Sequence, residues 1–105
     1  MTPEPIDGEN DSGHVVVKTM SLSQAEFDRS MRILAPENAP SKFHSLPCGA
    51  GCVVIRYDAL PSVTLGTLLA LPRARITLTF STVVTADDRA RVLERFDLAF
   101  QRGGG

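Results

Sequence analysis

An alternating run of apolar and polar residues, followed by a run with helical period, occurs twice in this chain. The first alternating segment spans residues 14–20, and a helical pattern follows it from Gln24 to Ala35. The second spans residues 75–82, and a helical pattern follows it from Ala86 to Arg102. Period 2 is typical of a half-buried strand and period 3.6 of an amphipathic helix. The chain therefore contains two predicted strand–helix units.

The first unit has clear boundaries. Val15 and Val17 share a face of the predicted strand. Ser23 and Glu26 match a capping box, in which the serine hydroxyl accepts from the third helical amide and the glutamate reaches back to the cap. Pro36 predicts the end of the helix. The residues expected on its buried side are Phe27, Met31, Leu34 and Ala35.

The segment between the two units is less regular. Three prolines and two glycines in residues 36–51 predict a loop. Residues 52–57 predict a strand, and residues 58–61 a turn after it. Residues 63–71 fit both alternation and helical spacing, and Gly66 with its β-branched neighbours favours a strand with a bend over a helix. Residues 72–74 would then form a short hairpin connection.

The second unit predicts a sheet that is covered on one side. Ile76, Leu78 and Phe80 alternate with threonines and a serine, which is typical of an antiparallel strand with one wet face. The last helix begins after Thr85, with two aspartates in its first turn, and Gly103 predicts its end. Its expected buried residues are Val92, Leu93, Phe96 and Phe100. Phe80 and Phe96 are expected to meet between the sheet and the helix.

These elements predict an α+β fold. We expect a two-layer sandwich in which a three- or four-stranded, mostly antiparallel sheet carries two helices packed on one face, in the order β-α-β-(β)-β-α. A chain of 105 residues has the size of one domain. We expect a single domain over residues 14–102, with flexible glycines at 103–105.

Charge separates a short tail from this domain. The net charge is −1, but residues 1–13 hold four acids and no base. With their prolines and glycines, these residues predict a disordered acidic tail. No apolar run approaches the roughly 20 residues that cross a bilayer, and no secretory signal is recognisable. We expect a cytoplasmic protein without a membrane partner.

Nucleic-acid binding is not expected. From the first helix onward, the order helix-strand-strand-strand-helix is similar to that of double-stranded-RNA-binding domains. That resemblance implies lysines that grip phosphates at the start of the last helix. This chain has Asp87 and Asp88 there, and the domain without its tail is only about three charges positive. The two aspartates are better interpreted as favourable charges at a helix start.

The densest group of reactive side chains is His44, Cys48 and Cys52. These residues are candidate zinc ligands or a redox pair, but three residues separate the cysteines, whereas a zinc knuckle usually has two. We expect ordinary reduced thiols and a surface histidine. No motif for nucleophilic, phosphate or dinucleotide chemistry occurs, so we expect no cofactor and lean against an enzyme. The terminal glycines resemble the tails of sulfur-carrier and ubiquitin-like proteins, but they follow a predicted helix instead of a strand.

The last helix offers a candidate interaction surface. Opposite its buried side, Arg91, Arg95 and Arg102 gather beside Leu98. Arginine around an apolar residue is a common composition of protein interfaces. The sequence therefore favours a small non-enzymatic interaction or regulatory module that binds a protein or a second copy of itself. The alternatives are a thiol- or metal-dependent protein that uses residues 44–52, and a weak nucleic-acid- or anion-binding domain.

Overall fold

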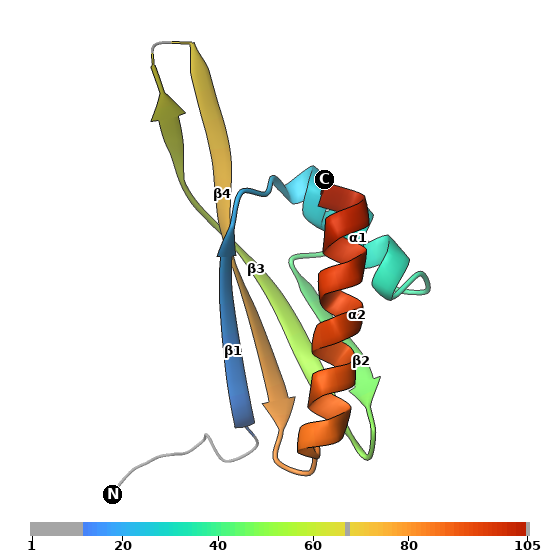
Figure 1. The fold of residues 1–105 in the computed structure, drawn as a ribbon. Coiled ribbons are helices and arrows are strands. Elements are labelled where there is room, and N and C mark those ends of the chain that lie inside the picture. The colour runs from blue at the N-terminus through green and yellow to red at the C-terminus, as the bar shows by residue number, and fades with distance from the viewer. Residues whose placement is uncertain (1–11, 67, 105) are drawn as a thin grey trace, which may run out of the picture.

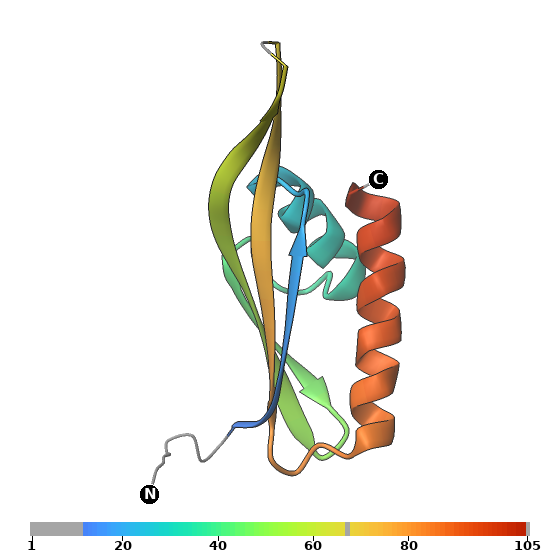
Figure 2. The ribbon, with the colours of Figure 1, turned by 60° about the vertical axis from the view of Figure 1, so that its left-hand side comes forward.

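The structure is a computed structural model that describes residues 12–66 and 68–104. Its elements are β1 (Ser12–Met20), α1 (Gln24–Leu34), β2 (Phe43–Cys48), β3 (Gly51–Leu65), β4 (Leu69–Ser81) and α2 (Ala86–Gly104). The four strands form one sheet in the order β1-β4-β3-β2, and every neighbouring pair is antiparallel. Both helices cover one face of this sheet (Figures 1 and 2). The α+β sandwich with its fourth strand is confirmed.

The core lies between the sheet and the two helices. From β4, Ile76, Leu78 and Phe80 are completely buried, and from the helices Phe27 and Phe96 are completely buried. Three aromatic rings join the two helices, because Phe100 lies 5.9 Å from Phe27 and 4.0 Å from Phe96 between ring centroids. The alternation in residues 75–82 and the helical spacing of the apolar residues therefore predict the buried faces correctly.

The start of α1 has the predicted capping box. The amide of Glu26 donates to Oγ of Ser23 at 3.2 Å, and the amide of Ser23 donates to the Glu26 carboxylate at 2.8 Å. These bonds satisfy two backbone groups that would otherwise lack partners at the helix end. Ala35 follows as the C-cap, directly before Pro36.

The predicted loop over residues 36–51 is wrong in its second half. Residues Phe43–Cys48 form β2, which pairs with β3 from Phe43 opposite Arg56 to Cys48 opposite Gly51. Pro47 is tolerated because β2 is an edge strand, where a missing amide costs no ladder bond on the outer side. The turn into β3 lies at Gly49 and Ala50.

The predicted turn over residues 58–61 and the predicted connection over residues 72–74 are also wrong. Strand β3 runs on to Leu65 and β4 begins at Leu69, so the reversal lies near Gly66, which has a φ of 69°. Between Leu60 and Val63 the register shifts, and this irregularity accommodates Pro61. A long β3–β4 hairpin is the result.

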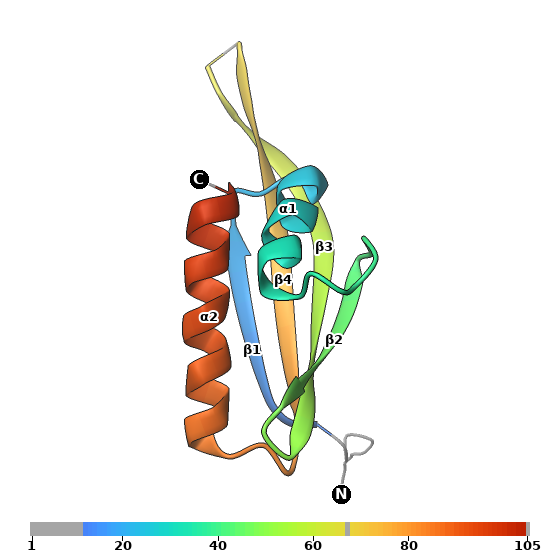
Figure 3. The same ribbon diagram turned by 90° about the vertical axis from the view of Figure 1, so that its right-hand side faces the viewer.

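The outer part of this hairpin extends well beyond the helices (Figures 1 and 3). We call residues 60–72 the arm. None of its described residues belongs to the buried core, which ends at Tyr57 on β3 and begins at Ala74 on β4. The radius of gyration is 15.1 Å, whereas a compact domain of about 100 residues has one near 13 Å. The arm makes the molecule elongated, with a longest extent of 48 Å.

The first strand and the last helix have different boundaries from those expected from the sequence. Strand β1 begins at Ser12, two positions before the strand expected from the alternation, and residues 1–11 of the expected tail lie outside the described part of the chain. Helix α2 continues through the predicted stop at Gly103 to Gly104. Gly105 and the side chain of Arg102 lie outside what the structure describes.

Candidate functional site: an apolar groove between the helices

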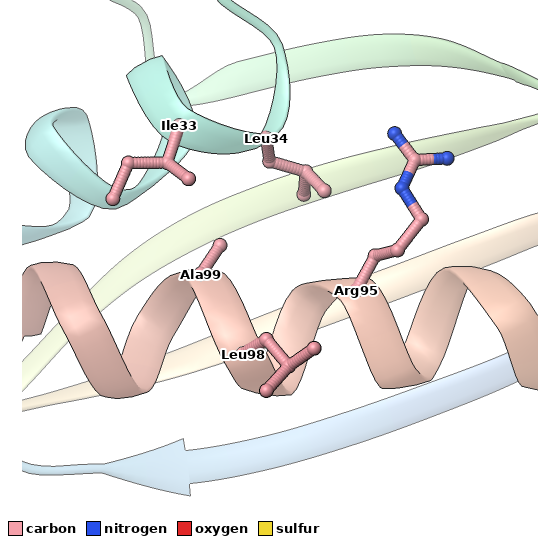
Figure 4. A pocket seen from close by; sticks show the side chains of 5 residues that line it. All are labelled: Ile33, Leu34, Arg95, Leu98 and Ala99. Carbon is pink, nitrogen blue, oxygen red and sulfur yellow. The ribbon is translucent and has the colours of Figure 1, made fainter.

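A shallow apolar groove lies between the two helices on the outer side of the molecule. Ile33 and Leu34 of α1 line it together with Arg95, Leu98 and Ala99 of α2, and its volume is about 190 Å³ (Figure 4). Leu34 and Ala99 are buried and form its floor. Ile33 and Leu98 are about half exposed, at 49% and 51%. Together they form an apolar surface patch, which is a common feature of interaction sites.

The helical period explains why these side chains meet. Helix α1 buries Phe27 and Met31 against the core, so Ile33, two positions after Met31, falls on a different side of the helix. In α2, Phe96 and Phe100 are buried, and Leu98 between them points outward. The ring contact of Phe100 in α2 with Phe27 in α1 joins the two helices.

Arginine supplies the charge of this surface. Arg95 lines the groove and forms no ion pair within the described residues. Arg91 is exposed and lies 3.5 Å from the Asp88 carboxylate, one turn earlier on α2. An unpaired guanidinium beside apolar side chains favours a ligand that offers a carboxylate next to an apolar group.

The structure brings together two of the four residues that the sequence nominated for this surface. Arg95 and Leu98 line the groove, Arg91 is exposed nearby but does not line it, and the side chain of Arg102 is not described. Sequence analysis missed Ile33. An apolar residue outside the buried stripe of α1 is the signal that would have found it, but only the fold places that residue beside Leu98.

The three candidate zinc ligands lie apart. Cys48 is buried under the helices, whereas Cys52 is exposed. Cys48 is opposite Gly51 and Cys52 is opposite Pro47, so alternation puts the two thiols on opposite faces of the sheet. In the described part of the chain, no group of three His, Cys, Asp or Glu side chains is arranged to hold a metal ion.

His44 is not the surface histidine that we expected from the sequence, because it is only 4% exposed. Its Nε2 lies 2.9 Å from the carbonyl oxygen of Ser41, and its Nδ1 lies 3.5 Å from the amide nitrogen of Asn38. With the proton on Nε2, the ring donates to the carbonyl and accepts from the amide. It also packs edge-on against Phe27. These contacts give His44 a structural role in tying the 36–42 loop to the core.

Burial also controls the chemistry of Cys48. Its pKa is raised above that of an ordinary thiol, first by burial and then by the charge of Asp88. Its thiol donates to the backbone oxygen of Asp88 at 3.7 Å. A thiol with a raised pKa is a poor nucleophile, because the thiolate is the reactive form. The arrangement therefore gives no support to the thiol-dependent alternative.

Comparisons with known proteins add no family assignment, because no family model, curated protein or solved structure matches this chain. Among the described residues, no helix is both long enough and apolar enough to span a membrane. Function must therefore be argued from the surfaces of the molecule.

Proposed function

We propose that this protein is a non-enzymatic interaction module that binds a partner protein through the groove between α1 and α2. The observation that carries this proposal is the half-exposed pair Ile33 and Leu98 beside the unpaired Arg95. Arginine is enriched among the residues that dominate binding energy at protein interfaces, and an exposed apolar patch with a polar rim is a common feature of interaction sites. The expected ligand is an apolar side chain flanked by a carboxylate.

A different protein fits this groove better than a symmetric homodimer that buries Ile33 and Leu98 of both copies. Such a contact would pack the same surface against itself. Arg95 lies in the groove and would come close to the Arg95 of the second copy. Like charges in a desolvated contact are unfavourable. We therefore expect a heterologous partner.

The proposal is tested by placing a photo-crosslinking amino acid at position 98 or at position 83 of the full chain in cells. Val83 is a suitable control because it is similarly exposed, at 58%, but lies in the turn before α2. We expect the probe to crosslink a partner protein from position 98 and not from position 83. The partner identified in this way, once purified, should bind the Leu98→Asp variant at least about tenfold more weakly than it binds the parent. Equal binding of the parent and Leu98→Asp would contradict the proposal.

A further inference from the structure

The arm is the most apolar exposed part of the molecule. Residues 60–72 contain no charged side chain. Leu68 near the tip is 97% exposed, and Leu65 and Leu69 are each 50% exposed. A two-stranded hairpin without a covered face is only marginally stable in water. A surface that receives these leucines would stabilise the arm.

Five apolar side chains of the arm share one face with two arginines. Leu65 is opposite Leu69, Val63 is opposite Leu71, and Leu60 is opposite Arg73. Opposed residues of an antiparallel pair point to the same side, as do alternate residues of a strand. Since Ala74 and Ile76 point toward the helix side, the face with Arg73 and Arg75 points away from it.

This open face has more bases than acids, whereas the two helices carry acids and arginines together. Arg56, Arg73 and Arg75 lie on the open face with a single acid, Asp58, which pairs with Arg56 at 3.3 Å. Neither Arg73 nor Arg75 forms an ion pair within the described residues. The other acids in the described part of the chain lie in the helices or in the loop after α1: Glu26, Asp28, Glu37, Asp87, Asp88, Glu94 and Asp97. The charge pattern favours an anionic surface as the binding partner of the open face.

A second copy of the chain does not fit the open face. It also exposes Val15 and Val17, so a two-fold dimer would lay each arm on these valines of the other copy. Val15 and Val17 lie beside Thr79 and Thr77 of β4. The two-fold axis would therefore pass near Ala74, which is midway along β4 between these threonines and the leucines of the arm. That arrangement puts Arg73 opposite the second copy's Arg75. The like charges oppose it, because Asp58, the acid that faces Arg75 in the register, is already paired with Arg56.

The composition of the arm suits a lipid surface better than a protein groove. Its residues are mostly leucine, valine, serine and threonine, types that are under-represented among the dominant contacts of protein interfaces. Pro61 on β3 and Pro72 on β4 each remove a backbone donor, and with the register irregularity they hinder the addition of a further strand. The arm is therefore expected to bind through the side chains of its apolar face and not through the backbone groups at its edges.

We propose that the arm docks this protein on an anionic lipid bilayer, with its leucines in the interface and Arg73 and Arg75 at the headgroups. Surface-bound elements sink about 5–10 Å into the boundary between headgroups and acyl chains. Because the edges of a hairpin have unpaired backbone groups, the arm lies with its apolar face down and does not cross the bilayer. This mode needs no spanning segment, which is why a search for apolar runs in the sequence predicts no membrane contact.

The test is sedimentation of the full chain with extruded vesicles of phosphatidylcholine alone or mixed equally with phosphatidylglycerol. We expect binding to the mixed vesicles, and weaker binding when the salt concentration is raised. Leu68→Asp should weaken this binding at least about tenfold, because a leucine that enters the interface is replaced by a charge. The matched control is Leu98→Asp, which puts the same charge on the helix side and should bind vesicles like the parent.

The arginines are tested separately. The Arg73→Gln/Arg75→Gln variant should lose about fivefold in affinity for each arginine on the mixed vesicles, whereas Arg91→Gln/Arg95→Gln should lose little. Failure of the parent to bind mixed vesicles, or unchanged binding by Leu68→Asp, would overturn the proposal. An arm-dependent dimer in sedimentation without vesicle binding would overturn it in favour of self-association. The helix groove is on the other side, so its proposed role stands or falls independently.

Discussion

At the scale of single residues, Gly49 combines a left-handed backbone with a close neighbour. It has a φ of 59° in the turn between β2 and β3, and the carboxyl group of Asp88 occupies the space where a Cβ would lie. A side chain here therefore meets two obstacles, the left-handed backbone and the N-terminal turn of α2. The glycine lets α2 begin close to the sheet.

The first prediction is that Gly49→Ala lowers the free energy of unfolding by more than the roughly 1–2 kcal/mol expected for the left-handed conformation alone. The additional loss comes from displacement of Asp88. Gly66→Ala is the control, because Gly66 has a φ of 69° but no atom lies within 4 Å of the added Cβ. Urea unfolding of both variants measures the difference. Equal losses would show that Asp88 moves aside without cost.

The raised pKa of Cys48 gives a second prediction at the residue scale. Above the ordinary pKa of a thiol, the unfolded chain loses this proton while the native protein still holds it. The native state then binds more protons, so the free energy of unfolding must fall as the pH rises toward the raised native pKa. Below the ordinary value, both states are protonated and Cys48 contributes no slope.

Unfolding in urea at a series of alkaline pH values checks this. We expect a shallower fall for Cys48→Ala than for the parent. Some slope remains in Cys48→Ala, since burial also raises the pKa of Tyr57. A parent and a Cys48→Ala variant with the same pH dependence would show that the buried thiol ionises normally.

At the scale of elements, the capping box fixes where α1 begins. Ser23→Ala removes the bond from the Glu26 amide to the serine hydroxyl and should lower the free energy of unfolding by about 1 kcal/mol. Ser45→Ala, at an exposed position in β2, serves as the control and should change stability by less than about 0.5 kcal/mol. Thermal unfolding of the two variants makes the comparison. A harmless Ser23→Ala would show that packing of Leu22 and Phe27 alone sets the helix start.

The elements differ in how far local sequence determines them. Both helices and the core half of β4 follow from periodicity and caps, because their buried faces repeat regularly. Strand β2 does not, since Pro47 and the polar residues of an edge strand give no strand pattern until β3 pairs with it. The length of the β3–β4 hairpin cannot be predicted from the local sequence either, because Pro61 and Pro72 are turn signals that here lie within paired strands. Pairing between distant residues decides these cases.

The same distinction holds for the candidate sites. Leu98 and Arg95 are recognisable from the sequence because helical spacing alone puts them outside the buried stripe. Ile33 joins them only through the packing of α1 on α2, which the order of elements does not specify. The arm leucines are visible in the sequence, but their shared face with Arg73 and Arg75 depends on the register across the irregularity between Leu60 and Val63.

At the scale of the whole molecule, two surfaces face in opposite directions. The groove with Leu98 lies on the helix side, and the arm presents its leucines with the arginines of the open face. A protein bound in the groove would thus remain accessible while the arm rests on a bilayer. The two proposals together describe an adaptor that holds a partner protein near a membrane surface.

The last prediction is that the domain folds without its arm. Replacement of residues 61–72 by an Asn-Gly turn would connect Leu60 to Arg73, which it faces in the register, and that turn type suits a two-residue hairpin. No buried core residue lies in the removed segment, and the recorded side-chain bond lost is that from Oγ of Ser21 to the carbonyl of Pro72, at 3.1 Å. The melting temperature should therefore change by no more than about 4–8 °C.

Small-angle scattering should show the radius of gyration falling from the 15.1 Å of the intact molecule toward about 13 Å. Circular dichroism across the melting transition gives the stability. Because Val53, Ile55 and the aromatic residues of the helices stay in place, the shortened sheet keeps its packed face. A variant that fails to fold would show that the arm contributes to the fold itself, and its exposed leucines would then need a structural explanation instead of a functional one.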